Sequence, residues 1–400
     1  MHSAQRNRRT QAEPGPLPFT LERVPIQILP YGASHIPAVK RFNARFDAAK
    51  VDSFRIGETA PETSTQTAAD AFRSYLAVDE TGEVRGGYFL RVQEMLVRGS
   101  VRNVGQYRAP LSEGIADKRY TAVGPMMLAH AIRTQPLLYS SGMGGLALPL
   151  PRMMKSIGWH VMEAPFWFRV LHGARFLRNI GPLRKDPVRR VASDILAFTG
   201  LGGAGIAIAQ FLRARIEAPA LRVEPLLSFD DRAARVWQQS AVDYSFSALR
   251  TGQYLQSNYP TLSTPYTTLG LSRGIELAGW VNLLDCKPWN AAFFGNMKVA
   301  AIIDGVAPRE NVPELVRAAV QAAKDNGSDM IFTNQTHQAW NDALRNAGFW
   351  QGPSNYLLAF SKELLKLLEP LDETIPHIHF NRGDGDGRVN LLPPDATQPA

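Results

Sequence analysis

The chain has 400 residues, of which 45% are hydrophobic and 20% are charged. This composition fits a folded protein rather than a disordered one, and the length suits two domains of common size. The single cysteine, Cys286, excludes an intramolecular disulfide and a cysteine-based zinc site, and it fits a reducing compartment such as the cytoplasm.

The net charge of +8 favours anionic partners such as a phosphorylated cofactor, an acidic lipid or nucleic acid. Basic residues are scattered, however, and no long basic run with interleaved aromatic residues occurs. We therefore expect no nucleic-acid binding. The N-terminal sequence is basic and polar without an apolar segment, which does not fit a secretory signal.

Strands and helices alternate through the first half of the chain, which predicts a sheet protein of mixed α/β type. The expected elements are, in order, a strand at 24–31, a helix at 35–50, a hairpin at 74–96, an extended segment at 100–115, a helix capped by Gly124 with Pro125 at its first position, a strand at 136–141, a helix at 149–158 and a strand pair at 159–171.

An apolar stretch at 195–212 separates the two halves. It reaches the lower bound for a membrane span and has arginines at both ends, so contact with a membrane surface is one interpretation. Glycines at 202, 203 and 205 favour the other interpretation, because packed protein covers exposed backbone better than lipid does. We expect an interdomain helix whose apolar side chains are covered by both domains.

The second half repeats the plan of the first. It predicts a strand at 221–229, a helix at 230–241, a hairpin at 266–286, a strand at 297–307, a helix at 310–327, a strand at 329–334, a helix at 338–348 and a final strand at 354–365. For the helix at 310–327, we expect Asn311 as N-cap, Glu314 to complete a capping box, and Gly327 beyond the end.

Two matching intervals support an internal repeat. Arg119 precedes the pair Gly158-Trp159 by 39 residues, and Arg309 precedes the pair Gly348-Phe349 by the same number. Each interval contains a helix, a strand and a helix. The repeat predicts a flexible tail at 1–19, one domain at 20–180, a helical linker at 181–218, a second domain at 219–370 and a tail at 371–400.

The segment Arg119-Tyr-Thr-Ala122-Val-Gly124 lies between the extended segment and the following helix. The first N–H groups of a helix have no partner on the helix and lie at the positive end of its dipole. A pyrophosphate can accept these donors where small residues keep the approach open, and an arginine can add a charge-assisted bond. The candidate cofactor-binding residues are Arg119, Ala122, Val123 and Gly124.

This segment resembles the Arg/Gln-x-x-Gly/Ala-x-Gly/Ala signature of the GNAT superfamily of N-acyltransferases, and the layout resembles two GNAT domains in tandem over 25–178 and 220–365. The stretch 248–259 and the tandem layout resemble members linked to polysaccharide or cell-envelope assembly, and more distantly the Fem aminoacyltransferases. The resemblance implies an α+β fold with two twisted mixed sheets flanked by helices. It also implies acetyl-CoA or another acyl-CoA as co-substrate and a small-molecule amine as acceptor, such as an amino sugar or envelope precursor.

The second half departs from the signature, because it reads Arg309-Glu-Asn-Val312-Pro-Glu314. A valine replaces the first small residue, and the carboxylate of Glu314 would repel a phosphate. We therefore expect the second domain to have lost cofactor binding.

Amine attack on a thioester needs a base and a donor for the oxyanion. Glu113 is the candidate base, and Tyr139 and Ser140 are candidate proton donors. Many members of the superfamily carry a tyrosine four residues before the glycine of the "GF" pair, where this chain has Met154 and Leu344. No metal site is expected.

Two alternatives to an acyl-CoA-dependent enzyme stay open. The missing tyrosine and the altered second motif favour a non-catalytic binding protein on a GNAT scaffold. A Fem-type aminoacyltransferase would carry a long charged helical hairpin, and none is visible. We expect a cytoplasmic protein, with contact to a membrane surface left open. The sequence does not define the oligomeric state.

Overall fold

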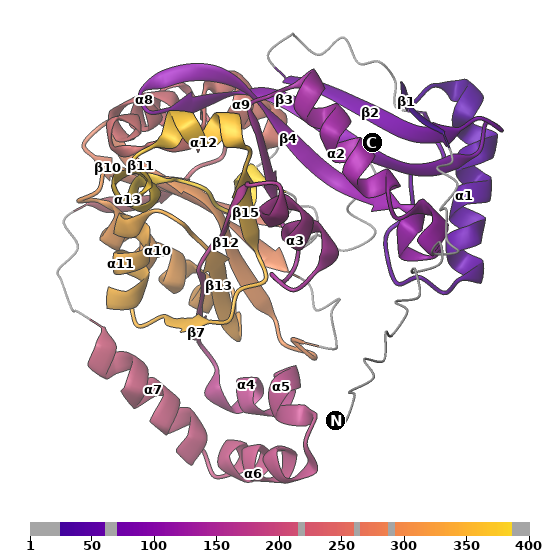
Figure 1. Ribbon diagram of the computed structural model, residues 1–400. Helices are drawn as coiled ribbons and strands as arrows, with labels where there is room; N and C mark the ends of the chain where they lie inside the picture. The colour runs from indigo at the N-terminus through magenta and orange to yellow at the C-terminus, as the bar shows by residue number, and fades with distance from the viewer. Residues whose placement is uncertain (1–24, 61–69, 215–220, 260–264, 287–292, 386–400) are drawn as a thin grey trace, which may run out of the picture. The chain divides into compact units, whose positions relative to one another are not determined.

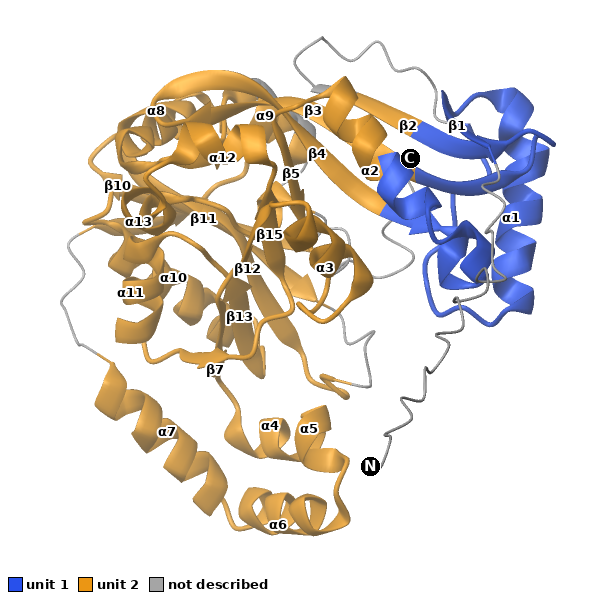
Figure 2. Cartoon of the chain, viewed as in Figure 1, with its two compact units in different colours: residues 1–61, 75–87, 110–127 blue, residues 62–74, 88–109, 128–400 orange. Residues whose placement is uncertain are grey.

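The computed structural model describes residues 25–60, 70–214, 221–259, 265–286 and 293–385. The chain forms two compact units, coloured separately in Figure 2: unit 1 comprises residues 1–61, 75–87 and 110–127, and unit 2 comprises residues 62–74, 88–109 and 128–400. Four elements belong partly to each unit, namely β2 (Asp70–Asp79), β3 (Val84–Val97), β4 (Ser100–Ser112) and α2 (Val123–Thr134).

Unit 1 is built on a short antiparallel strand pair and one amphipathic helix. Strand β1 (Ile26–Pro30) pairs antiparallel with the end of β2. Helix α1 (Ile36–Ala48) buries Val39, Phe42 and Phe46, whose spacing of three and four residues places them on one face. These side chains join a core that includes Leu76, Val84 and Leu111. The strand and helix expected at 24–31 and 35–50 are confirmed.

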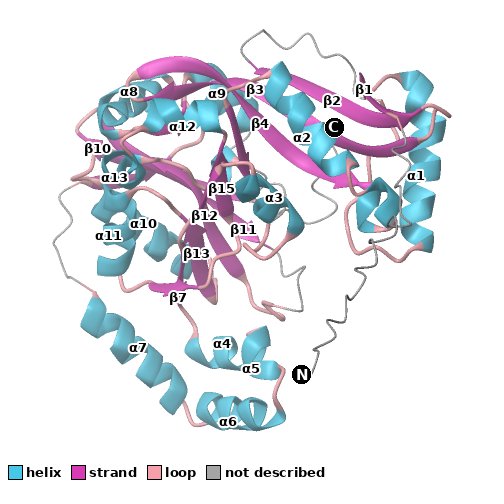
Figure 3. Cartoon of the chain, viewed as in Figure 1, coloured by secondary structure: helices cyan, strands magenta, loops and turns pink. Residues whose placement is uncertain are grey.

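The strands form two mixed sheets, seen in Figure 1 and Figure 3, of which the second lies wholly in unit 2. In the first sheet β4 pairs parallel with β5 (Leu138–Ser141), and β15 (Leu357–Phe360) lies antiparallel between β5 and β6 (His160–Glu163). Strand β9 (Phe246–Ala248) pairs with β3.

The second sheet has the order β14-β7-β13-β12-β11-β10-β8, and only its β12–β13 pair is parallel. Its strands are β7 (Phe166–Val170), β8 (Arg222–Pro225), β10 (Tyr266–Arg273), β11 (Glu276–Cys286), β12 (Val299–Val306), β13 (Met330–Asn334) and β14 (Trp350–Gly352). Helices α10 (Val312–Asp325) and α11 (Gln338–Asn346) pack on one face, and α8 (Asp231–Ser240) packs on the other.

The two sheets exchange one strand each. In the first sheet β15 is inserted between β5 and β6, and in the second sheet β7 is inserted between β13 and β14. The expectation of a strand pair at 159–171 is therefore wrong, because β6 and β7 are consecutive in sequence but belong to different sheets. The final strand expected at 354–365 ends at Phe360, where Ser361 caps helix α12 (Lys362–Leu368).

Two further expectations need correction. Asn311 is the N-cap of α10, but its side chain bonds the carbonyl of Ala278, and Glu314 accepts from the N–H of Leu221, so no capping box forms. Residues 371–385 are not a tail, because they form α13 (Leu371–Thr374) and a segment whose Phe380 is fully buried. Residues 1–24 and 386–400, which include the rest of the expected tails, lie outside the described residues. Unit 2 also contains helices α3 (Pro149–Ser156) and α9 (Gly252–Asn258).

Four helices connect the two halves of the chain: α4 (Gly173–Asn179), α5 (Gly181–Arg184), α6 (Pro187–Phe198) and α7 (Leu201–Arg213). The single helix expected at 195–212 is broken between α6 and α7, where Gly200 adopts a φ of +74° and the axes bend by 82°. A Cβ at Gly173 would lie 2.6 Å from Cα of Gly203, so glycine permits the close contact of α4 with α7.

The expectation that both domains cover this segment is wrong. The apolar side chains of α6 and α7 are largely exposed: Val188, Val191, Ile195, Leu196, Phe198, Leu201, Ile208, Phe211 and Leu212. In the described part of the chain, no single helix has the length and apolarity to cross a membrane; α6 and α7 meet the criterion only as a bent pair.

Candidate functional site

The loop that leads into α2 is anchored at both of its ends within unit 1. At its start, Glu113 is buried and its carboxylate accepts from Arg45 Nε at 2.7 Å and from Arg85 Nη1 at 3.0 Å. Near its end, the guanidinium of Arg85 lies 4.3 Å from the ring centroid of Tyr120. Arg85 also binds Asp79 at 2.7 Å. These contacts fix the path of residues 113–120 before any ligand arrives.

The candidate cofactor residues follow this anchored loop. Arg119 is an exposed side chain that forms an ion pair with Asp117 at 2.6 Å, and the Arg119 hydrogen bond lowers the pKa of Asp117. Ala122 is exposed, whereas Val123 is buried as the first residue of α2. A Cβ at Gly124 would meet nothing closer than Cβ of Ser112 at 4.0 Å. The N-terminal turn of α2 is therefore open above Gly124, as an approaching phosphate requires.

In unit 2, strands β4 and β5 stop pairing soon after they meet. Their last pair is Gln106 with Tyr139, although β4 continues to Ser112. Directly beyond this pair, the buried Ser140 hydroxyl donates to the carbonyl of Tyr107 at 2.9 Å. A side-chain bond thus replaces the next ladder bond, and the backbone of β4 beyond Tyr107 is released from β5. Ala109 lies in this released stretch with a φ of +42°, which is strained for a residue with a Cβ.

The second sheet repeats this arrangement. The last pair between β12 and β13 is Ala301 with Phe332, and the hydroxyl of Thr333 then donates to the carbonyl of Ile302 at 2.8 Å. In each sheet, the first residue beyond the last parallel pair therefore carries a hydroxyl that donates to the backbone of the neighbouring strand. Ser140 and Thr333 each follow the last paired residue of their strand by one position, so the two hydroxyls occupy equivalent places in the two sheets.

In the second sheet, a segment near the C-terminal end of the chain, residues 381–384, lies beyond the last parallel pair. Asn381 pairs with Gln335 beyond the end of β13, and its side-chain amide donates to Asp304 of β12 at 2.9 Å. A Cβ at Gly383 would lie 3.0 Å from Cγ of Asp304. Residues 381–384 thus lie against the part of β12 that no longer pairs with β13.

A buried arginine holds this segment in place. Arg250 has no exposed surface and contacts Asp304 at 3.1 Å and Asp384 at 2.8 Å. Burial raises the pKa of Asp384 to about 6, and the neighbouring Asp304 carboxylate acts in the same direction. Two carboxylates that share one cation carry a net negative charge in a buried place, which is the physical reason for this shift.

Tyr139 and Ser140 lie where β4 and β5 part. The hydroxyl of Tyr139 accepts from Gln93 Nε2 at 2.8 Å, and burial raises its pKa well above 10. Gly385 lies close to the end of β5, because a Cβ at this glycine would lie 2.8 Å from the Ser141 hydroxyl. Tyr139 and Ser140 are consecutive on β5, so their side chains leave the strand on opposite faces.

The third candidate catalytic residue, Glu113, lies in unit 1 with Arg119, Ala122, Val123 and Gly124. Both of its carboxylate oxygens bind guanidinium groups, so its geometry suits anchoring the loop better than accepting a proton. The sequence does not reveal the roles of Arg250, Asp304 and Asp384. Arg250 lies in the stretch 248–259 and Asp304 in the strand expected at 297–307, but no local pattern indicates that they are buried together with Asp384.

No protein-family model matches the sequence, and no curated protein matches it either. Among solved structures, the chain is similar to Saccharomyces cerevisiae N-myristoyltransferase with bound myristoyl-CoA, at 10% identity and a TM-score of 0.50, with 88% of each chain covered.

Weaker similarity extends to two bacterial proteins. A probable N-acyltransferase from Enterococcus faecalis gives 11% identity and a TM-score of 0.48, with 86% of this chain and 74% of that chain covered. A GCN5-related N-acetyltransferase from Anabaena variabilis gives 11% identity and a TM-score of 0.49, with 84% and 72% covered. We base the fold assignment on the yeast enzyme alone. The chain has the GNAT-type fold of N-acyltransferases.

Proposed function

We propose that the protein is an N-acyltransferase that moves an acyl group from acyl-CoA to an amine, with the first half of the chain holding the cofactor. The observation that carries this proposal is the parting of β4 from β5 after Gln106 and Tyr139. The released backbone of β4 offers amide and carbonyl groups with which the amides of a pantetheine arm would pair. The open N-terminus of α2 and the exposed Arg119 would bind the pyrophosphate.

The reaction would be direct attack of the amine nitrogen on the thioester carbonyl. A C–N bond forms, the C–S bond breaks, and the proton that leaves the amine ends on the sulfur of CoA. Tyr139 keeps its proton at neutral pH because burial raises its pKa well above 10, so it would serve as a donor rather than as a base. We assign Glu113 to holding the loop rather than to proton transfer.

We propose that the second half binds no acyl-CoA. Its counterpart of the released strand is covered by residues 381–384, which Arg250 ties to β12. At the N-terminus of α10, Val312 and Glu314 are buried, and Glu314 bonds the N–H of Leu221. These contacts leave the second half to support the fold and to shape the surroundings of the acceptor.

The acceptor would be a small amine, and the resemblance of residues 248–259 supports an amino sugar or an envelope precursor. We further propose a cytoplasmic location, where acyl-CoA is available. The single Cys286 is buried and burial raises the pKa of its thiol to about 12, so it would remain a thiol there.

A non-catalytic binding protein on the same fold is the second candidate. It is favoured by Met154 and Leu344, both fully buried, at the positions where many members of the superfamily carry a tyrosine. This candidate predicts that acyl-CoA fails to bind, or binds without release of free CoA when amines are supplied.

The test is a thermal melt of the purified protein with acetyl-CoA and with longer acyl-CoA. Arg119→Glu should abolish the ligand-dependent rise in melting temperature, because repulsion replaces attraction beside the pyrophosphate. Arg309→Glu is the matched control in the second half and should leave the rise intact. Equal loss in both variants, or no rise in the wild type, would refute the assignment. Release of free thiol upon addition of amines separates the enzyme from the binding protein.

A further inference from the structure

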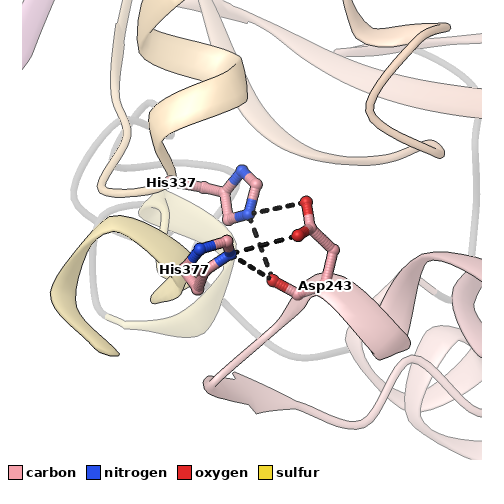
Figure 4. Close-up of side chains that lie close together, drawn as sticks. All are labelled: Asp243, His337 and His377. Carbon is pink, nitrogen blue, oxygen red and sulfur yellow. Dashed lines mark hydrogen bonds and ion pairs between the residues drawn. The ribbon is translucent and has the colours of Figure 1, made fainter. Parts of the chain in front are cut away.

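Three side chains from distant parts of the sequence point toward one another in unit 2 (Figure 4). Asp243 follows α8, His337 is the N-cap of α11, and His377 lies just before the C-terminal segment. His337 Nε2 lies 3.5 Å from Asp243 Oδ2, and His377 Nδ1 lies 3.1 Å from Asp243 Oδ1. All three ligand atoms lie within 4.8 Å of one another.

We propose that Asp243, His337 and His377 bind one divalent transition-metal ion, with Zn²⁺ the best fit. Imidazole nitrogen and carboxylate oxygen are the ligand types that zinc prefers, at about 2.0–2.2 Å. Two such ligands at a tetrahedral angle are separated by about 3.3–3.5 Å, close to the separations of both histidine nitrogens from the carboxylate. The ion would lie among the three side chains and would replace direct hydrogen bonds by metal bonds.

The surroundings suit a metal ligand more than a charged histidine. His337 is buried, and its ring packs edge-on against Tyr244 at 5.2 Å between centroids. Its Nδ1 has no hydrogen-bond partner among the described residues, so Nε2 is the nitrogen directed at the carboxylate.

The site would keep an open coordination position. Asp243 and His337 line a cavity of about 490 Å³ that also contains Arg309 and Trp340. Three protein ligands with a free fourth position are the arrangement of catalytic zinc sites, whereas structural zinc sites use four. A metal beside a guanidinium would attract an anion, so we assign the cavity to a carboxylate or phosphate ligand. This inference does not depend on acyl transfer.

The test uses the full chain without a histidine tag, stripped by chelator and then titrated with Zn²⁺ by calorimetry. We expect one Zn²⁺ per chain. His337→Gln and His377→Gln should each weaken binding by more than about 100-fold, the upper range for losing a group that only orients a ligand. His160→Gln, a change of a histidine outside the cluster, is the matched control and should bind as the wild type does.

Co²⁺ supplies a readout that does not depend on the folding of any variant. A four-coordinate Co²⁺ site in the wild type should give intense visible absorption, which inorganic phosphate should shift by occupying the open position. Circular dichroism confirms that each variant is folded. Absence of stoichiometric Zn²⁺ in the wild type, or equal affinity in folded His337→Gln, would overturn the proposal and leave a hydrogen-bonded triad.

A second inference rests on the exposed face of α6 and α7. On α6, Val188, Val191, Ile195 and Phe198 recur at intervals of three and four residues and form one stripe, with exposed fractions of 57–83%. On α7, Leu201, Ile208, Phe211 and Leu212 are exposed by 59–77%. A contiguous apolar surface of this kind is unusual on a soluble monomer and marks an interaction site.

Charge indicates the partner. Lys185, Arg189, Arg190 and Arg213 are exposed around these helices, and α7 contains no acidic residue. We infer that α6 and α7 lie on the surface of an anionic lipid bilayer, with the apolar stripe in the acyl–headgroup boundary and the basic residues at the phosphates. The bend at Gly200 would let both helices lie on one plane rather than cross it.

Sedimentation with vesicles tests this inference. The wild type should pellet with phosphatidylcholine vesicles that contain phosphatidylglycerol and much less with phosphatidylcholine alone. Phe198→Ser with Leu212→Ser should abolish pelleting, and because both residues are exposed the melting temperature should stay unchanged. Leu227→Ser with Ile275→Ser, two equally exposed apolar residues elsewhere in unit 2, is the control. No vesicle binding, with a stable dimer that the same double variant dissociates, would assign the face to a second copy instead.

Discussion

Asp117 and Arg119 form an ion pair at the proposed cofactor site. In the free protein the Arg119 guanidinium binds Asp117, so a pyrophosphate has to compete with that carboxylate. Asp117→Asn keeps an acceptor for the Arg119 N–H but removes the competing charge. We expect acyl-CoA to bind about twofold more tightly, a small effect because exposed ion pairs are weak. Titration calorimetry measures this, and weaker binding by Asp117→Asn would contradict the assigned role of Arg119.

Asp384 predicts a pH dependence of stability. Its pKa is about 6 in the folded protein, above the ordinary value of 3.8, so the folded state binds the proton more tightly than the unfolded state. Stability is therefore lost as the pH rises from about 4 to about 6. Compared with Asp384→Asn, which does not titrate, the wild type should lose about 1 kcal/mol between pH 5 and pH 7. Urea unfolding at both pH values measures this, and a constant difference would refute the shift.

At the residue scale, only local signals are readable in the sequence. Arg119 and Gly124 are candidate cofactor residues because one short motif precedes a helix, and their role stays a prediction. Asp243 and His377 lie 134 residues apart, so no local pattern could indicate a metal cluster. The polar sequence around Asp384 is typical of a loop, and only the buried Arg250 turns it into a core segment.

At the scale of the elements, the hydroxyls of Ser140 and Thr333 lie where each parallel strand pair ends. Ser140→Ala and Thr333→Val each leave a buried carbonyl without its donor, so each should lower the free energy of unfolding by about 1–3 kcal/mol. Only Ser140→Ala should also weaken acyl-CoA binding, because residues 381–384 cover the released part of β12. Denaturant unfolding and calorimetry measure both effects. Weakened binding by Thr333→Val alone would reverse the assignment of the two halves.

Element positions followed from periodicity, but their partners did not. The strands at 136–141 and 329–334 and the helix at 310–327 were predicted because their apolar spacing is clear. Strands β7 and β15 were recognised as extended segments, yet neither sequence says which sheet it joins. The apolar stretch at 195–212 was expected to be covered, because its glycines permit close packing. Gly203 does permit close packing of α7 against α4, while the other side of α7 stays exposed.

The strand exchange makes the two halves interdependent at the scale of the whole molecule. A fragment of residues 1–218 would lack β15, which separates β5 from β6, and a fragment of residues 219–400 would lack β7. Neither fragment should fold cooperatively alone, whereas co-expression should yield a complex with the spectrum of the whole chain. Circular dichroism melts of the three samples test this. Cooperative unfolding of an isolated fragment would show that the exchanged strand is dispensable.

The central claim is that the molecule holds one acyl-CoA site, formed by its first half. Calorimetric titration of the intact protein with acetyl-CoA and with a long-chain acyl-CoA tests it most directly. We predict one molecule bound per chain, with binding removed by Arg119→Glu and retained by Arg309→Glu. No binding of either compound, or two sites per chain, would contradict the account.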